Sequence, residues 1–123
     1  MPKYTITNLD LLYRRFSIID EPKFASFWKL ENGRKIPSSA AFKTKPNEDG
    51  LSVNIASLTT PEKIVLNANE FGVAEIAALL PIGLGFECKH KPRPRNRSHA
   101  IIVGNTNPIA RKLANAITHV YQF

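Results

Sequence analysis

Residues 89–97 carry the most distinctive charge pattern in the chain. Basic residues occupy every second position of this basic segment: Lys89, Lys91, Arg93, Arg95 and Arg97. In an extended chain, side chains two positions apart project to the same side, so the five cations would form one ridge. Lysine and arginine both bind phosphate oxygens, and arginine presents a forked pair of donors to them. The spacing therefore predicts a surface that follows a phosphate backbone.

The overall charge supports an anionic partner. The formal net charge is +7, and subtracting the five cations of the basic segment leaves +2 for the rest of the chain. Concentrated charge of this kind favours a nucleic acid or a phosphorylated small molecule. The alternative is a charged strand edge that prevents aggregation, since Pro92 and Pro94 predict an edge or a loop. The segment contains no aromatic residue, which argues against stacking of bases on it.

His99 continues the alternation of the basic segment and is the candidate catalytic residue. It comes directly before an apolar stretch, residues 100–103, which is typical of a short buried strand. Imidazole exchanges protons near neutral pH, so His99 could serve as an acid or base toward a bound phosphate ester. Local hydrogen bonding is the alternative role. No cofactor is indicated.

Two further pairs of residues are candidate ligand-binding groups. Arg14 and Arg15 lie in a predicted strand, where neighbours face opposite sides, so at most one of them would join a common site. Ser38 and Ser39 precede a short apolar stretch. No nucleophile motif surrounds them, so hydrogen bonding at the start of a strand is the alternative to ligand binding.

Cysteine usage and hydropathy indicate the compartment. Cys88 is the only cysteine, so no intramolecular disulfide can form, and a cytoplasmic location is expected. Cys88, His90 and His99 match no common zinc spacing, so no metal site is predicted. No apolar run approaches the roughly 20 residues of a membrane span, and no signal peptide is recognised. No membrane association is expected.

Periodicity and turn residues predict the elements that position these groups. The predicted strands are residues 11–19, 24–30, 38–43, 51–56, 86–91 and 100–103. The first of these also fits the middle of a helix that begins at Asn8, and its aromatic and β-branched content favours the strand. Asn32 and Gly33 predict a tight hairpin turn after the second of them. A helix is expected to start at Thr60 and end at Gly72, and residues 73–80 fit either a helix or a buried strand. The final helix carries its apolar stripe on these residues: Ile109, Leu113, Ala116, Ile117 and Val120.

The order of elements predicts one globular domain, residues 1–123, because no repeat or linker divides the chain. Strands occur both before and after the first clear helix. This order favours an α+β fold with a mostly antiparallel or mixed sheet and two or three helices packed on one face. The length and composition do not indicate an oligomeric state, and a homo-oligomer or a protein partner is compatible with both.

Several phrases resemble known proteins. The order LYRRF, PSSAAFK, GLSV and NRSHAIIVG is similar to a family of small bacterial proteins of uncharacterised function. A fainter resemblance is to ADP-ribosyltransferase-type toxins, in which an arginine on an early strand and a serine on a later strand line a nicotinamide pocket. That resemblance implies such roles for Arg14 or Arg15 and for Ser38 or Ser39. The late glutamate motif of those toxins is not recognised in this chain.

Three functions remain open from the sequence. The first is a domain that binds nucleic acid or another phosphate-bearing ligand through the basic segment. The second is a small toxin-like enzyme that acts on RNA or NAD with His99 as acid or base. The third is a regulatory subunit with no ligand of its own. A structure tests the second of these by showing whether His99, Arg14 and the basic segment share one cleft, because the enzyme loses its geometry if they lie on opposite faces.

Overall fold

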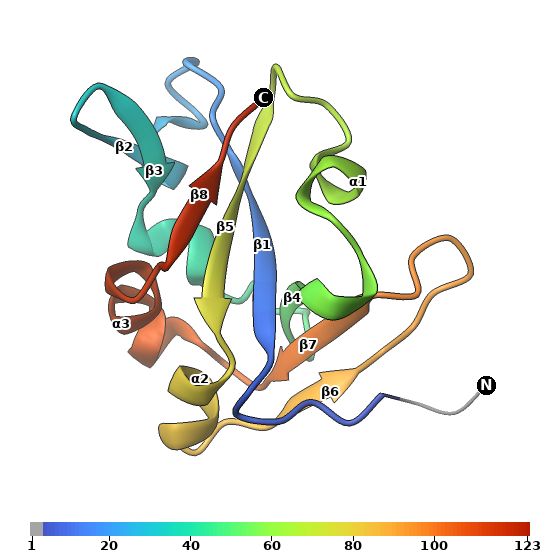
Figure 1. The fold of residues 1–123 in the computed structure, drawn as a ribbon. Coiled ribbons are helices and arrows are strands. Elements are labelled where there is room, and N and C mark those ends of the chain that lie inside the picture. The colour runs from blue at the N-terminus through green and yellow to red at the C-terminus, as the bar shows by residue number, and fades with distance from the viewer. Residues whose placement is uncertain (1–3) are drawn as a thin grey trace.

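The computed structural model describes residues 4–123, and a six-stranded antiparallel sheet forms its centre (Figure 1). The strands of this sheet are, in spatial order, β6 (Cys88–His90), β7 (His99–Val103), β4 (Gly50–Ile55), β1 (Leu11–Ser17), β5 (Phe71–Ala77) and β8 (His119–Tyr121). A separate hairpin joins β2 (Trp28–Glu31) to β3 (Arg34–Pro37). The predicted α+β fold with an antiparallel sheet is confirmed.

Short helices cover both faces of the sheet. The helices are α1 (Pro61–Val65), α2 (Leu79–Gly83) and α3 (Ala110–Asn115), together with the 3-10 helices η1 (Ala25–Phe27), η2 (Ser39–Phe42), η3 (Ala56–Leu58) and η4 (Asn107–Ile109). Helices α2 and α3 pack with η2 on one face, and α1 lies on the other side of β1 (Figure 1). None of the helices within residues 4–123 is both long and apolar enough to cross a bilayer.

The main core lies on the face that α2, α3 and η2 cover. Every second residue of strand β4 belongs to this core: Leu51, Val53 and Ile55 are buried in it. Side chains alternate between the two faces of a strand, so Ser52 and Asn54 point to the opposite face. A smaller cluster on that face joins Tyr13, Ile64, Val65 and Val73. The five residues of α1 cover β1 and β5 there, and Ser52 and Asn54 of β4 are half-buried on the same face.

Several predicted elements are confirmed. The predicted strand over residues 11–19 forms β1, which ends at Ser17. The tight hairpin turn is present, with positive φ angles of 52° at Asn32 and 78° at Gly33. The side chain of Thr60 caps α1 by accepting a hydrogen bond from the backbone N–H of Lys63. These features depend only on local sequence.

The predicted strand over residues 38–43 is wrong, because this segment forms η2. Pro37 ends β3, and the backbone N–H of Lys43 donates to the carbonyl of Ala40. The helical turn buries the consecutive residues Ala41 and Phe42 on the same side. A strand would have placed them on opposite faces, so burial of both side chains favours the turn.

Two predicted helices end earlier than expected. Helix α1 ends at Val65, after which Leu66 adopts a φ of 62°, and Phe71 belongs to β5, paired with Ser17. Helix α3 ends at Asn115, and Val120 lies in β8, paired with Ala74. In both cases an apolar residue that fits the helical stripe is instead paired in the sheet, where Val120 is buried and Phe71 is half-buried. The local pattern does not reveal this pairing.

Candidate functional site

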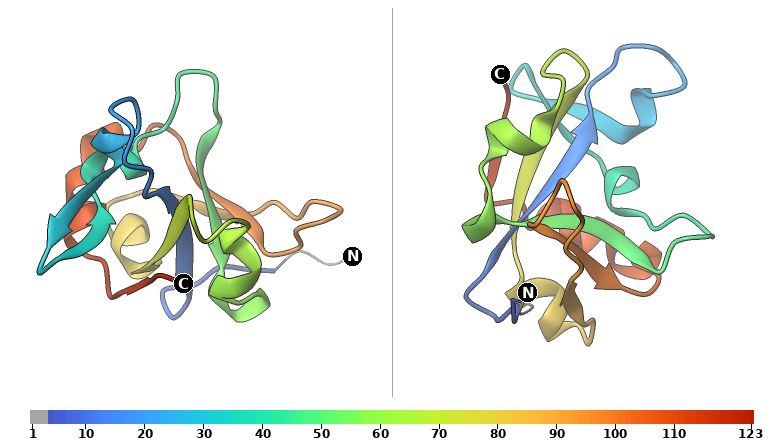
Figure 2. Two further views of the ribbon diagram at one scale, coloured as in Figure 1. Left: turned by 90° about the horizontal axis from the view of Figure 1, so that it is seen from above. Right: turned by 90° about the vertical axis from the view of Figure 1, so that its right-hand side faces the viewer.

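A cleft opens where β1 and β4 separate. The last paired residues of these strands are Tyr13 and Asn54, and from Arg14 onward β1 pairs only with β5. Strand β4 instead continues its pairing with β7. The right-hand view of Figure 2 shows the two strands diverging from this point. The cleft has a volume of about 790 Å³, within the range of ligand sites.

Seven cations line this cleft, and its lining includes no carboxylate among the described residues. The cations are Arg14, Arg15, Lys45, Lys63, Arg93, Arg95 and Arg97. The only ion pairs within residues 4–123 join Lys35 to Asp20 and Lys89 to Glu87, so the protein's own acids form none with the cations of the cleft. Cations grouped around one hollow raise the local concentration of anions there.

Arg14 occupies the fork between the two strands. Its Nε donates to the carbonyl of Ala41 at 2.8 Å, and its Nη1 donates to the carbonyl of Ser52 at 2.9 Å. A guanidinium has five N–H donors, so three have no partner among residues 4–123. Burial lowers the pKa of Arg14 to about 10, and the side chain therefore remains a cation at neutral pH. The charge of Glu48 partly offsets this lowering, but no ion pair within residues 4–123 joins the two side chains, so the desolvated cation favours binding of an anion.

Arg15 lines the same cleft from the other side of the fork. Its guanidinium lies 4.7 Å from the centre of the Phe71 ring, and its Nη1 donates to the carbonyl of Ile64 at 3.4 Å. The expectation that Arg14 and Arg15 face opposite sides of the strand is correct. The inference that only one could join a common site is wrong, because the cleft passes through the fork and both residues line it.

The basic segment is not the extended ridge that its alternation predicts. Arg93 and Asn96 exchange two backbone hydrogen bonds, each of 3.0 Å, which close a tight turn. Strand β6 has already ended, and proline cannot donate to a continuing ladder. Lys89 forms an ion pair with Glu87 at 3.1 Å, and Lys91 lines a smaller neighbouring cavity. The three arginines of the segment are its only residues that bring a cation to the cleft.

Three polar residues that were not selected from the sequence, Asn54, Asn96 and Ser98, fasten this turn to β4. The side-chain oxygen of Asn54 accepts hydrogen bonds from Asn96 Nδ2 at 2.8 Å and from Ser98 Oγ at 2.9 Å. A ring nitrogen of His90 contacts the carbonyl of Arg97 at 2.6 Å. The signal for Asn54 was its place in β4, where it alternates with apolar core residues. These bonds hold the arginines beside the fork.

His99 lies in the cleft with a defined tautomer. Its Nδ1 is 2.9 Å from the carbonyl of Lys91, which can only accept, so Nδ1 carries the proton. Its Nε2 is then free to accept a hydrogen bond from the hydroxyl of Ser52, at 3.3 Å. Burial is the main cause that lowers the pKa of His99, so its imidazole is neutral at neutral pH. His99, Arg14 and the three arginines therefore share one cleft.

We expect His99 to make the fold sensitive to acid. Its folded pKa lies below the usual value of 6.5, so the unfolded chain binds this proton more readily. Stability should therefore decrease as the pH falls through about 6.5 toward the folded pKa. Replacement of His99 by glutamine should make the unfolding free energy less dependent on pH across this interval, as measured by urea unfolding. An unchanged pH dependence in H99Q would contradict the assignment.

Aromatic side chains add an apolar wall to the cleft. Phe24, Phe27 and Phe71 line it, although none is near the basic segment in the sequence. Rings beside cations are suited to nucleotides, because the ring can contact a base while the cation binds its phosphate. The absence of aromatic residues from the basic segment suggested that bases would not stack here. The fold supplies the rings from two other segments.

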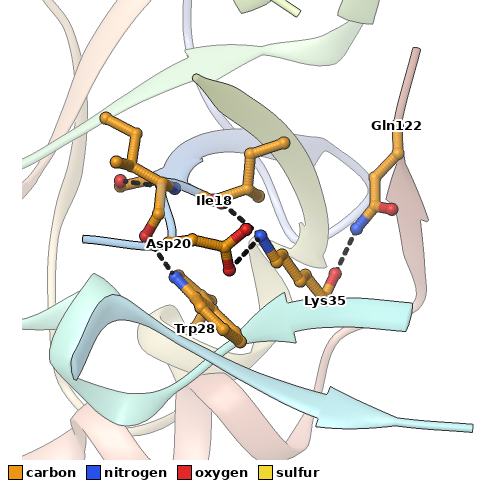
Figure 3. A network of polar contacts seen from close by, with 7 residues as sticks. Ile18, Asp20, Trp28, Lys35 and Gln122 are labelled. Atoms are coloured by element: carbon orange, nitrogen blue, oxygen red, sulfur yellow. Dashed lines mark hydrogen bonds and ion pairs between the residues drawn. The ribbon is translucent and has the colours of Figure 1, made fainter. Parts of the chain in front are cut away.

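A polar network holds the segment that carries two of these rings (Figure 3). Lys35 Nζ donates to the carbonyl of Ile18 at 2.7 Å and pairs with Asp20 at 2.8 Å, and it lies 4.4 Å from the centre of the Trp28 ring. Trp28 Nε1 donates to the carbonyl of Ile19 at 2.8 Å. These contacts fasten the β2–β3 hairpin to the chain that leaves β1. Phe24 and Phe27 follow directly on that chain.

The two serines predicted to bind a ligand lie outside the cleft. The hydroxyl of Ser38 donates to the backbone carbonyl of Ser26, which is the local role considered as the alternative. Ser39 lines a separate shallow depression that also includes Lys43 and Arg111. Three other serines line the cleft, Ser17, Ser52 and Ser98, and of these Ser52 contacts His99. Like Asn54, Ser52 could have been found from the sequence as a polar residue between apolar residues of β4.

Comparisons with known proteins found no match. No protein-family model matches the chain, and neither the curated proteins nor the solved structures include one that matches. The resemblance to small bacterial proteins and to ADP-ribosyltransferase-type toxins therefore stays a prediction from the sequence. The charges, contacts and burial within the cleft indicate a site.

Proposed function

We propose that the protein binds single-stranded nucleic acid in the cleft between β1 and β4. The observation that carries the proposal is the set of seven cations around one cleft whose lining contains no carboxylate within the described part of the chain. Cations that neutralise phosphates supply most of the affinity of nucleic-acid binding. The unused donors of Arg14 suit a phosphate at the bottom of the cleft.

The aromatic wall favours a single strand over a duplex. The bases of a duplex are stacked on one another, whereas those of a single strand expose their faces. Phe24, Phe27 and Phe71 line the same cleft as the cations, so a base and its phosphate could bind there together. The three arginines lie on a turn at the rim and are exposed to solvent, where they can follow the strand beyond the cleft.

The test is a salt titration of binding to a short fluorescent single-stranded RNA, measured by anisotropy. The variant R93Q/R95Q/R97Q should lose about 100-fold in affinity at low salt, because three phosphate contacts are removed. The slope of log affinity against log salt should decrease by about 2 in this variant, since each contact on a single strand contributes about 0.7. Wild-type binding should weaken steeply between about 50 and 200 mM salt.

A matched control separates the cleft from net charge. The variant K43Q/R111Q/K112Q removes three exposed cations that line a separate depression. It has the same net charge as the cleft variant, and its affinity should stay within about threefold of wild type. Equal losses in the two variants, or wild-type binding that is insensitive to salt, would contradict a site in the cleft.

A further inference from the structure

We propose that the same cleft cleaves RNA, with His99 as the general base toward a ribose 2′-hydroxyl. This inference rests on the proposed binding of single-stranded nucleic acid and names RNA as its substrate. Three features of the structure carry it: an oriented base, a hydroxyl already held at that base, and a cation with unused donors next to both.

The base is oriented as in sites that activate a hydroxyl. The carbonyl of Lys91 fixes the proton on Nδ1 of His99, at 2.9 Å, and leaves the lone pair of Nε2 available. The hydroxyl of Ser52 contacts that lone pair at 3.3 Å. A hydroxyl, a base and a group that orients the base is the arrangement expected of an activated nucleophile. His99 lines the cleft but only 5% of its surface is exposed, so a substrate hydroxyl reaches Nε2 by displacing the hydroxyl of Ser52, whose contact is long.

Arg14 is positioned to stabilise the negative charge that develops on the phosphate. Ser52 connects the two groups, because its hydroxyl contacts His99 and its carbonyl accepts from Arg14 Nη1 at 2.9 Å. The guanidinium is held by a second bond to Ala41, so its remaining donors have a fixed direction. Preorganised donors next to a developing charge are usually the largest single contribution to catalysis.

The step balances without any other reactant than water. The 2′-O–H bond breaks and its proton moves to Nε2 of His99, while the 2′-oxygen forms a bond to the adjacent phosphorus. The bond from phosphorus to the 5′-oxygen breaks, and that oxygen takes a proton from water. His99 then returns its proton to the solvent. The products are a 2′,3′-cyclic phosphate and a 5′-hydroxyl end.

The experiment uses the full chain and an end-labelled single-stranded RNA. H99Q should lower the cleavage rate by at least about 100-fold, the usual contribution of a general base, while its RNA affinity stays within about threefold. H119Q is the matched control, because His119 is exposed on β8 and does not line the cleft, and it should cleave as wild type does. Circular dichroism verifies that both variants are folded.

Modified substrates test the nucleophile without any variant. DNA and 2′-O-methyl RNA of the same sequence should bind and remain intact, and the RNA product should carry a 2′,3′-cyclic phosphate. Wild-type protein that binds RNA but leaves it intact would overturn this inference and leave the proposed binding function standing. A protein that binds none of the three would overturn both. A phosphoryl adduct on Ser52, detected by mass spectrometry during turnover, would make Ser52 the nucleophile and also overturn the inference.

Discussion

Replacing Arg14 by lysine is expected to lower the affinity for single-stranded RNA by about 50-fold, although the charge is retained. The arginine fork holds two carbonyls, of Ala41 and Ser52, and still has three N–H donors for a phosphate. A lysine has a single nitrogen and cannot span both carbonyls and the ligand. The variant therefore either releases the carbonyls or gives up the phosphate. Anisotropy with the labelled RNA measures the loss.

Arg34 provides the matched control for this substitution. Its Nη2 also donates to a backbone carbonyl, that of Val120 at 3.0 Å, but it does not line the cleft. R34K should bind RNA within about twofold of wild type, because the arginine that it loses also bonds a backbone carbonyl but lies outside the cleft. If R14K binds as tightly as R34K, the positive charge alone is sufficient and the fork of Arg14 has no special role.

Much of the fold could be predicted from the sequence because its signals are local. The alternation of apolar residues in β4, the Asn32-Gly33 turn and the Thr60 cap depend on neighbouring residues, and each is present. Pattern reasoning was wrong at residues 25–27, which form η1 in place of the first part of a predicted strand. It was also wrong at η2 and at the ends of α1 and α3. There, burial against distant segments decided the conformation. The same apolar residue can fit the stripe of a helix or a strand that pairs with a distant segment, so the local pattern does not distinguish the two.

The candidate site was only partly visible in the sequence. Arg14, Arg15, His99 and the arginines of residues 93–97 were selected by type and spacing, and the fold brings them to one cleft. Their grouping depends on the point at which β1 and β4 stop pairing, which no local pattern encodes. The aromatic wall, the asparagines and Ser52 come from segments whose proximity is likewise set by sheet register. The turn of the basic segment, and not the alternation of its charges, brings its arginines to the cleft.

The segment η2 connects the core to the cleft. Phe42 is fully buried in the main core, and the carbonyl of its neighbour Ala41 accepts from Arg14. The carbonyl of Phe42 accepts from the hydroxyl of Thr106. The Thr106 side chain is itself buried and contacts that of Thr44 at 2.8 Å. The position of Arg14 therefore depends on how firmly η2 is packed against the sheet.

Replacing Phe42 by alanine should have the largest effect on stability. Loss of a fully buried phenylalanine removes its burial energy and leaves a cavity, at a cost of about 3 to 5 kcal/mol. That is a large part of the stability of a typical domain, about 5 to 15 kcal/mol. Urea unfolding followed by circular dichroism measures the change. F123A is the control, because Phe123 is 53% exposed, and it should change the unfolding free energy by less than about 0.5 kcal/mol.

The same variant distinguishes packing from site chemistry. If η2 positions Arg14 through Ala41, F42A should weaken RNA binding even at a temperature where the variant remains folded. The more conservative F42L keeps most of the volume, so it should cost less stability and retain most of the affinity. If F42A is destabilised but binds RNA as tightly as wild type, Arg14 keeps its place without η2. Its bond to Ser52 would then be sufficient to hold the guanidinium in the fork.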